Sequence, residues 1–206
     1  MIELDQKLFL FLNSLHSPFF DTVMRILSIK TVWIPLYLAI IWMIARKYGK
    51  SAWIPLLIIP VLVLVDDRGA NLLKNLTERL RPCHEPALAG LVHTGNGHLP
   101  YVPIRPCHEP ALAGLVHTVN GHCPGMYSFV SGHAANSFGV AAYSASLLGR
   151  RWYTWSIFVW AALVSYSRIY LGVHYPGDIL AGALLGLIAG TGLAWIAQRM
   201  IKNAKQ

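Results

Sequence analysis

Five apolar stretches of the chain alternate with short polar segments. They cover residues 31–45, 52–65, 134–148, 152–164 and 179–197. A helix needs about 20 predominantly apolar residues to cross a bilayer, so several stretches require their polar flanks to complete a span. The pattern therefore predicts an all-α protein, an integral membrane helical bundle with about five transmembrane helices.

The N-terminal stretch from Leu8 to Leu27 has a different pattern, because five polar or helix-breaking residues interrupt it. They are Asn13, His16, Ser17, Pro18 and Asp21. This pattern favours one or two amphipathic helices that lie at the membrane interface over a further span. We expect residues 1–206 to form a single integral membrane domain.

The composition agrees with a membrane protein. Of the 206 residues, 55% are hydrophobic and 13% are charged, whereas about a quarter of the residues in a soluble domain are charged. This excludes a disordered chain, a collagen-like chain and a small disulfide-rich module. The net charge of +8 is common in nucleic-acid-binding proteins, but the Lys and Arg residues flank apolar stretches instead of forming one basic face. We therefore expect membrane lipids as partners and no nucleic acid.

The positions of the basic residues predict an orientation in the membrane. Clusters follow the first, third and fifth stretches: Arg46, Lys47 and Lys50, then Arg150 and Arg151, then Arg199, Lys202 and Lys205. If each stretch crosses the membrane, all three clusters lie on one side, which the positive-inside rule makes cytoplasmic. Residues 74–129 and 168–178 then face outwards. We expect a multi-pass protein of the cell inner membrane whose unusual polar residues face the periplasm or the cell exterior.

The expected outer loop, residues 82–126, carries most of a tandem duplication. The letters RPCHEPALAGLVHT occur at residues 81–94 and again at 105–118, a period of 24 residues (105 − 81). Solenoid repeats diverge in sequence and need about three copies, so we interpret these two copies as a recent or engineered duplication. The cysteines are Cys83, Cys107 and Cys123. Cys123 can pair with either of the others in an oxidising compartment, or all three can stay reduced.

Two groups of polar residues at the ends of apolar stretches suggest anion binding. Lys74 precedes Arg81 by seven residues, about two helical turns, so we expect both cations on one helix face, where they form an anion clamp. The alternative is a pair of cations that only marks the membrane interface.

The third apolar stretch is directly preceded by Ser131, Gly132 and His133. A Ser cap beside Gly presents backbone N–H groups at the positive end of a helix, and His133 is placed to donate a proton; the alternative is ordinary capping.

A third group contains Ser167, Arg168, His174 and Asp178. A His and an Asp four residues apart can meet at a turn, where the carboxylate would hold the ring N–H and make His174 a candidate nucleophile. A structural His–Asp pair is the alternative. A phosphoryl group requires cations, an in-line nucleophile and an acid for the departing oxygen, and the three groups together provide these. Because the short spacings typical of metal sites are missing, we expect no metal.

The order and spacing of these motifs resemble the signature of the type 2 phosphatidic acid phosphatase superfamily, which includes vanadium haloperoxidases and glucose-6-phosphatase. The motifs are Lys74-x6-Arg81-Pro82, Ser131-Gly132-His133 and Ser167-Arg168-x5-His174-x3-Asp178, within residues 73–178. Two features depart from the family pattern. Val130 stands where the family usually has Pro, and this replacement removes no chemical group from the site. Arg105-Pro106 duplicates Arg81-Pro82, but no Lys lies seven residues before Arg105.

The resemblance implies an all-helical bundle that needs neither metal nor cofactor. It implies that His174 forms a phosphohistidine, that Asp178 orients His174 and that His133 protonates the leaving alcohol. The phosphate-binding residues would be Lys74, Arg81, Ser131, Gly132 and Arg168.

These roles predict a membrane phosphatase that hydrolyses a lipid phosphate monoester or diphosphate at the outer face of the inner membrane. The candidate substrates are phosphatidic acid, phosphatidylglycerol phosphate and undecaprenyl diphosphate. The alternatives are a lipid A phosphatase and a catalytically silent lipid-binding scaffold. The sequence does not distinguish among these substrates, and it predicts no oligomeric state.

Overall fold

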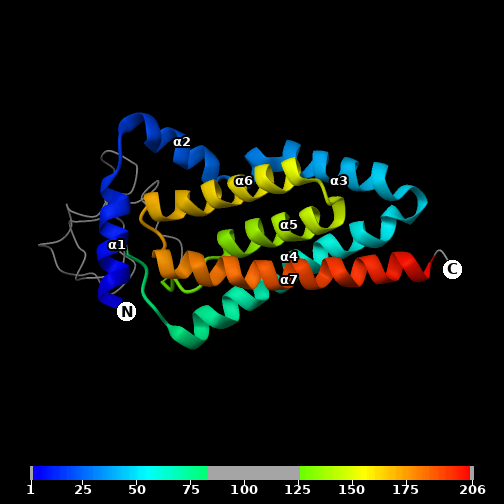
Figure 1. The fold of residues 1–206 in the computed structure, drawn as a ribbon. Helices are drawn as coiled ribbons and strands as arrows, with labels where there is room; N and C mark the ends of the chain where they lie inside the picture. Colours follow the sequence, from blue (N-terminus) through cyan, green and yellow to red (C-terminus); the bar gives the residue numbers. More distant parts are fainter. Residues whose placement is uncertain (1, 83–125, 205–206) are drawn as a thin grey trace, which may run out of the picture.

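The computed structural model describes residues 2–82 and 126–204, and its regular elements in these ranges are helices apart from one isolated β-bridge between Leu80 and Tyr127. The prediction of an all-α fold is therefore confirmed for these ranges. The helices are α1 (Ile2–Ser14), α2 (Pro18–Ser28), η1 (Lys30–Trp33), α3 (Ile34–Tyr48), η2 (Gly49–Ala52), α4 (Trp53–Thr77), α5 (Gly132–Leu148), α6 (Arg151–Tyr170) and α7 (Pro176–Asn203) (Figure 1).

Helices α3 to α7 each contain all or most of one of the five apolar stretches, and α1 and α2 occupy the interrupted N-terminal stretch. The boundary between α1 and α2 has a local cause: Ser17 caps α2 by accepting a hydrogen bond from the Phe20 backbone N–H, and Pro18 takes the first helical position, where the missing N–H of proline costs nothing. Figure 1 shows α1 lying across one end of the bundle and α2 running alongside α6.

Helix α5 lies at the centre of the bundle and packs against α4, α6 and α7. Its contact with α7 is close because glycines recur four residues apart along the facing side of α7. A Cβ atom on Gly182 would lie 2.5 Å from the Ser131 carbonyl oxygen, and one on Gly186 would overlap the Ala135 carbonyl oxygen. Small residues at such crossings are typical of membrane helix bundles. This contact fixes the beginning of α5 against the beginning of α7.

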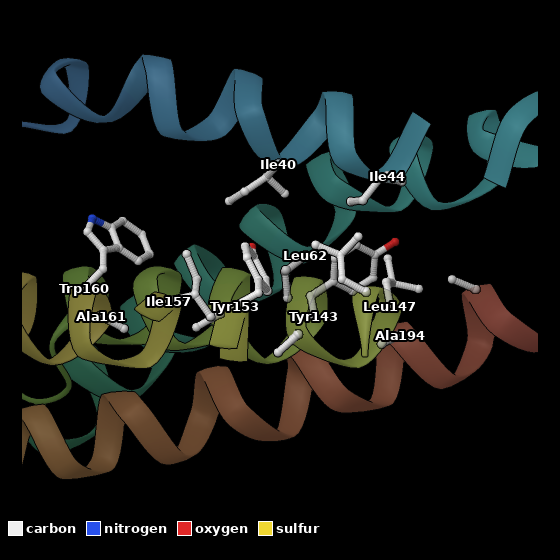
Figure 2. Close-up of a cluster of buried hydrophobic side chains, with 14 of the residues drawn as sticks. Ile40, Ile44, Leu62, Tyr143, Leu147, Tyr153, Ile157, Trp160, Ala161 and Ala194 are labelled. Carbon is white, nitrogen blue, oxygen red and sulfur yellow. The ribbon is translucent and has the colours of Figure 1, made fainter. Parts of the chain in front are cut away.

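Large apolar side chains lie both inside and outside the bundle. Figure 2 shows the inner cluster, to which α3 to α7 all contribute: Ile40, Ile44, Leu62, Tyr143, Leu147, Tyr153, Ile157, Trp160, Ala161 and Ala194. The outer faces of α3, α4, α6 and α7 expose further bulky residues, among them Leu38, Leu57, Trp155 and Leu184. Continuous apolar outer surfaces of this kind are expected where helices contact lipid.

Within residues 2–82 and 126–204, two continuous helical stretches are long and apolar enough to cross a membrane: Lys30–Thr77 and Pro176–Asn203. The first stretch folds back on itself at Gly49, whose φ of 53° lies in the left-handed region, so α3 and α4 run in opposite directions (Figure 1). By length and composition, the expected number of about five transmembrane helices is not confirmed. Helix α5, with 17 residues, is short for a span.

The basic clusters, as far as the structure describes them, lie at one end of the bundle, where α3 turns into α4, α5 turns into α6, and α7 ends (Figure 1). Tryptophans accompany them: the Arg46 guanidinium lies 5.1 Å from the Trp42 ring, and that of Arg199 lies 4.0 Å from the Trp195 ring. The opposite end holds the end of α4, the beginning of α5 and the α6–α7 connection. The polar motifs of the sequence therefore meet at the end away from the basic clusters.

Candidate active site

The beginning of α5 forms one side of the site. Ser131 is the N-cap: its side chain accepts a hydrogen bond from the Ala134 backbone N–H at 3.4 Å, as the sequence predicted. Its own backbone N–H donates to the Asp178 carbonyl at 3.0 Å, which connects α5 to α7. The Lys74 ammonium lies 3.9 Å from the position that a Cβ would take on Gly132. A cation therefore lies beside the positive end of the α5 dipole, an arrangement that favours an anion between them.

The predicted helical clamp of Lys74 and Arg81 is wrong in its geometry. Helix α4 ends at Thr77, because the next residue, Glu78, takes a left-handed conformation with φ 47°. Arg81 therefore lies in the segment beyond the helix, where its Nη1 atom donates to the Val173 carbonyl at 3.4 Å. The two cations still interact electrostatically. Burial lowers the pKa of Arg81 to about 10, which leaves the guanidinium charged at neutral pH.

Arg81 and Arg168 are both buried, and both have an unused hydrogen-bond donor. Arg168, near the end of α6, contacts the Ser28 hydroxyl through Nη1. The Nε atoms of the two arginines have no hydrogen-bond partner among the described residues. Burying an unpaired donor of a charged group is costly. An anion held between the guanidinium groups would supply the missing acceptors and offset their like charges.

His174 lies in the α6–α7 connection, 2% exposed. Its Nδ1 atom is 3.6 Å from Asp178 Oδ2, just beyond hydrogen-bond length. The same oxygen accepts a hydrogen bond from the Tyr175 backbone N–H at 2.8 Å. The structure thus brings the predicted pair together without the hydrogen bond that we expected. Burial, followed by the charges of Arg81, Arg168 and Lys74, lowers the pKa of His174 well below its ordinary value of 6.5. The ring is therefore neutral at neutral pH.

His133 is the second residue of α5 and faces the α2–η1 turn. The backbone carbonyl of Ser28 lies within hydrogen-bonding reach of its ring, and the charges of Arg168 and Lys30 act on it together with His174. The two histidines therefore belong to one electrostatic cluster, although 41 residues separate them (174 − 133). All eight predicted site residues are at this end of the bundle.

Arg79 and Asp5 belong to the same network and were missed by the sequence analysis. Arg79 donates from Nη1 to Asp178 Oδ1 at 3.0 Å and from Nη2 to Asp5 Oδ2 at 2.7 Å, and its guanidinium lies 4.0 Å from the Tyr175 ring. Asp5 also accepts a hydrogen bond from the Gly177 backbone N–H at 2.8 Å. Asp5 carries no motif signal, because its role depends on α1 folding across the end of the bundle.

Replacing Arg79 with Ala is expected to lower kcat by about 10- to 100-fold, because Asp178 loses a charged partner and the His174–Asp178 pair shifts. Phosphate release from a lipid phosphate, measured on detergent-purified protein, checks this. Arg150→Ala, at the opposite end of the bundle, is the matched control and should retain activity. An Arg79→Ala variant that is folded and fully active would show that Arg79 does not position the pair.

A cavity of about 340 Å³ opens beside the site between α3, α4, α5 and α6. Ser28, Lys30 and His133 line it at the site end. Most of the remaining lining is apolar and includes Ile40, Ile59, Leu62, Val140, Tyr143 and Trp160. A polar site that continues into an apolar cavity is suited to an amphiphilic ligand. The residues that the structure describes contain no group of three or more His, Cys, Asp or Glu side chains able to hold a metal ion.

Several predictions concern residues outside the described ranges. Arg105 and the second copy of the duplication belong to this group, as do the possible disulfides of Cys83, Cys107 and Cys123. Val130, at the family's usual proline position, is described and is fully buried immediately before the Ser131 cap.

Comparisons with known proteins agree with this geometry. Residues 51–202 match the sequence model of the PAP2 superfamily. The chain is 34% identical over 201 residues to a protein of Bacteroides thetaiotaomicron named lipid A 4'-phosphatase. The aligned region covers 96% of this chain and 79% of that protein.

Two solved structures have a similar fold at 22% sequence identity. Superposition on the structure of Aquifex aeolicus LpxE gives a TM-score of 0.60 and covers 95% of both chains. That of a PAP2-type phosphatidylglycerolphosphate phosphatase from Bacillus subtilis has a TM-score of 0.65 and covers 96% of this chain and 86% of that one.

Proposed function

The chain belongs to the PAP2 superfamily as a membrane lipid phosphatase, and we propose that its substrate is a phosphate monoester on a glycolipid of the lipid A type. The support for this substrate is the similarity to the Bacteroides lipid A 4'-phosphatase, which covers 96% of this chain. The match therefore includes most of the N-terminal helices as well as the family segment. A second candidate is a lipid diphosphate, such as undecaprenyl diphosphate, which the cation Lys30 beside the cavity favours.

The observation that carries the proposed chemistry is the arrangement of two buried guanidinium groups around a neutral histidine. Arg81 and Arg168 each have an Nε donor with no partner in the part of the chain that the structure describes, and both act electrostatically on His174. We assign these arginines, with Lys74 and the backbone of Ser131 and Gly132, to the oxygens of the transferred phosphate. The positive end of α5 and the side-chain cations then bind the phosphate oxygens together, as phosphoryl transfer requires.

In the proposed first step, His174 attacks the phosphorus atom. Its Nδ1 atom faces Asp178, so the lone pair on Nε2 forms the new P–N bond while the bond from phosphorus to the leaving oxygen breaks. The bound phosphate offsets the charges of Arg168 and Lys30 that act on His133, so that His133 can hold the proton that the leaving oxygen takes as the lipid alcohol departs. Asp178, held by Arg79, orients the ring and offsets the positive charge that develops on it.

In the proposed second step, water hydrolyses the phosphohistidine. His133, now neutral, takes a proton from the attacking water as the P–O bond forms and the P–N bond breaks. Inorganic phosphate is released, His174 returns to its neutral form, and His133 is protonated again. The chain's own residues supply every group in this cycle, and neither metal nor cofactor takes part.

We also propose that α3 to α7 all span the inner membrane, that α1 and α2 lie at its outer interface, and that the site faces the periplasm or cell exterior. The exposed apolar faces of α3, α4, α6 and α7 support five spans, since α5 is enclosed by its neighbours. The basic clusters at the opposite end support the orientation, because such clusters favour the cytoplasmic side.

Phosphate release from a panel of lipids tests the proposed substrate. The panel contains lipid A, phosphatidic acid, phosphatidylglycerol phosphate and undecaprenyl diphosphate, and the assay includes a chelator. We expect lipid A to be hydrolysed with the highest kcat/KM and the His174→Asn variant to release nothing above background. A different best substrate would overturn the lipid A assignment. No release from any lipid by folded protein would instead favour a catalytically silent scaffold.

A further inference from the structure

Helix α1 contacts the chain on both sides of His174. Before His174, the buried Asn13 amide donates to the carbonyls of the last two residues of α6, at 3.2 and 2.8 Å. After His174, the Phe9 ring packs edge-on against the Tyr175 ring, with the ring centroids 5.4 Å apart. Asp5, Phe9 and Asn13 follow one another at intervals of four residues, so they lie on one face of the helix. This face of α1 holds the connection that carries His174.

Asp5 is the charged residue of this face, and both of its carboxylate oxygens are used. Oδ1 accepts a hydrogen bond from the Gly177 backbone N–H at 2.8 Å, and Oδ2 accepts one from Arg79 Nη2 at 2.7 Å. The Gly177 N–H lies in the first turn of α7, where a backbone N–H has no partner within its own helix. A Cβ atom on Gly177 would lie 2.8 Å from Asp5 Oδ2, so glycine at this position admits the carboxylate.

Asp5 and Asp178 share the guanidinium of Arg79 through different nitrogens. Nη1 donates to Asp178 Oδ1 at 3.0 Å, while Nη2 donates to Asp5. Because the guanidinium is planar and rigid, the bond to Asp5 fixes the direction from which Nη1 meets Asp178. The Arg79 side chain is 24% exposed, whereas that of Asp178 is fully buried. Without Asp5, Arg79 is free to turn towards solvent and leave Asp178 without its charged partner.

We infer that Asp5 is a positioning residue: through Arg79 and the Gly177 N–H, it holds Asp178 and the connection that carries His174 in the arrangement needed for attack on phosphorus; this inference rests on the proposed function. A residue on which the reaction depends then lies on α1, outside residues 51–202, the segment that matches the family. Asp5 is not among the residues assigned to the phosphate, so its loss should act on kcat more than on KM.

The kinetics of Asp5→Asn test this role. Asn keeps an oxygen that can accept from the Gly177 N–H, but it removes the negative charge and turns an amide NH₂ group towards Arg79. We expect kcat for phosphate release from the best lipid substrate to fall about 10-fold, with KM changed by less than about 2-fold. Glu3→Gln is the matched control, because Glu3 is an exposed carboxylate of the same helix that pairs with Lys7 at 2.7 Å.

Dependence on Arg79 separates positioning from a general effect on the fold. Because Asp5 acts on Asp178 through Arg79, Asp5→Asn should lower kcat by less than about 2-fold when Arg79→Ala is already present. Losses that multiply in full in the double variant would overturn the inference. An Asp5→Asn variant as active as Glu3→Gln would overturn it as well.

Backbone hydrogen exchange gives a second measurement, which needs no turnover. Asp5→Ala removes both acceptor oxygens, so the peptide that contains His174 and Gly177 should exchange at least about 5-fold faster than in the wild type, while Glu3→Gln leaves it unchanged. Unchanged exchange in Asp5→Ala would overturn the inference. If the wild type released no phosphate from any lipid, faster exchange in Asp5→Ala would still support the positioning role, and the proposed hydrolysis alone would fail.

Discussion

Replacing His174 with Asn is expected to lower kcat for phosphate release by at least about 10⁴-fold, as is typical when a catalytic nucleophile is removed. Asn preserves a polar side chain of similar reach but has no ring nitrogen to form a bond with phosphorus. The wild-type ring is neutral and lies beside Arg81 and Arg168, so the loss should fall on chemistry more than on substrate binding. Rates measured over a range of lipid phosphate concentrations, with chelator present, separate kcat from KM.

The folding of the His174→Asn variant is the necessary control. His174 is 2% exposed, but its Nδ1 has no hydrogen-bond partner among the described residues, so the substitution breaks no hydrogen bond of that atom. We expect a monodisperse protein in detergent that still binds dodecylphosphonate. A folded variant that keeps more than about a tenth of wild-type kcat would exclude His174 as the nucleophile.

Replacing His133 with Ala is expected to lower kcat by about 10²- to 10⁴-fold for an alkyl phosphate, the range for loss of a general acid–base. The reason is that an alkoxide is a poor leaving group unless it is protonated as the P–O bond breaks. With p-nitrophenyl phosphate, whose leaving anion is stable without a proton, formation of the phosphoenzyme should be much less affected. Rapid-mixing measurements of p-nitrophenol release should therefore show a burst followed by slow turnover.

The comparison of the two substrates is what makes this prediction specific to His133. If the burst rate with p-nitrophenyl phosphate falls as far as the rate with the alkyl phosphate, His133 does not protonate the leaving group. His133 would then act in binding the phosphate or in holding the α2–η1 turn. Normal turnover of both substrates by the variant would remove His133 from the mechanism.

The sequence predicted the helices well, because helices depend on short-range patterns. Each of α3 to α7 contains all or most of one apolar stretch, and the Ser131 cap is a local feature that its neighbours determine. The glycine spacing on α7 that allows close contact with α5 is also local. The position of Arg81 was predicted wrongly, because helical spacing holds only inside a helix and α4 ends at Thr77.

The contribution of the N-terminal helices was beyond sequence reasoning. Their interrupted apolar pattern indicates amphipathic helices but does not show what the polar residues bind. In the structure, the buried Asn13 amide donates to the carbonyls of Ile169 at 3.2 Å and Tyr170 at 2.8 Å, and Asp5 pairs with Arg79. These contacts join residues far apart in the chain, so only the packing of α1 across the bundle defines them. The same holds for Ser28 and Lys30 beside His133.

The central claim is that phosphate is transferred to His174, and a direct search for that covalent intermediate tests it most directly. The His133→Ala variant is mixed with p-nitrophenyl phosphate, quenched in alkali, where phosphohistidine is stable, digested, and analysed by mass spectrometry. Our account predicts a phosphate on the peptide that contains His174, and its absence when His174→Asn is combined with the first substitution. Phosphate on another residue, or burst release of p-nitrophenol with no phosphorylated peptide, would contradict the account.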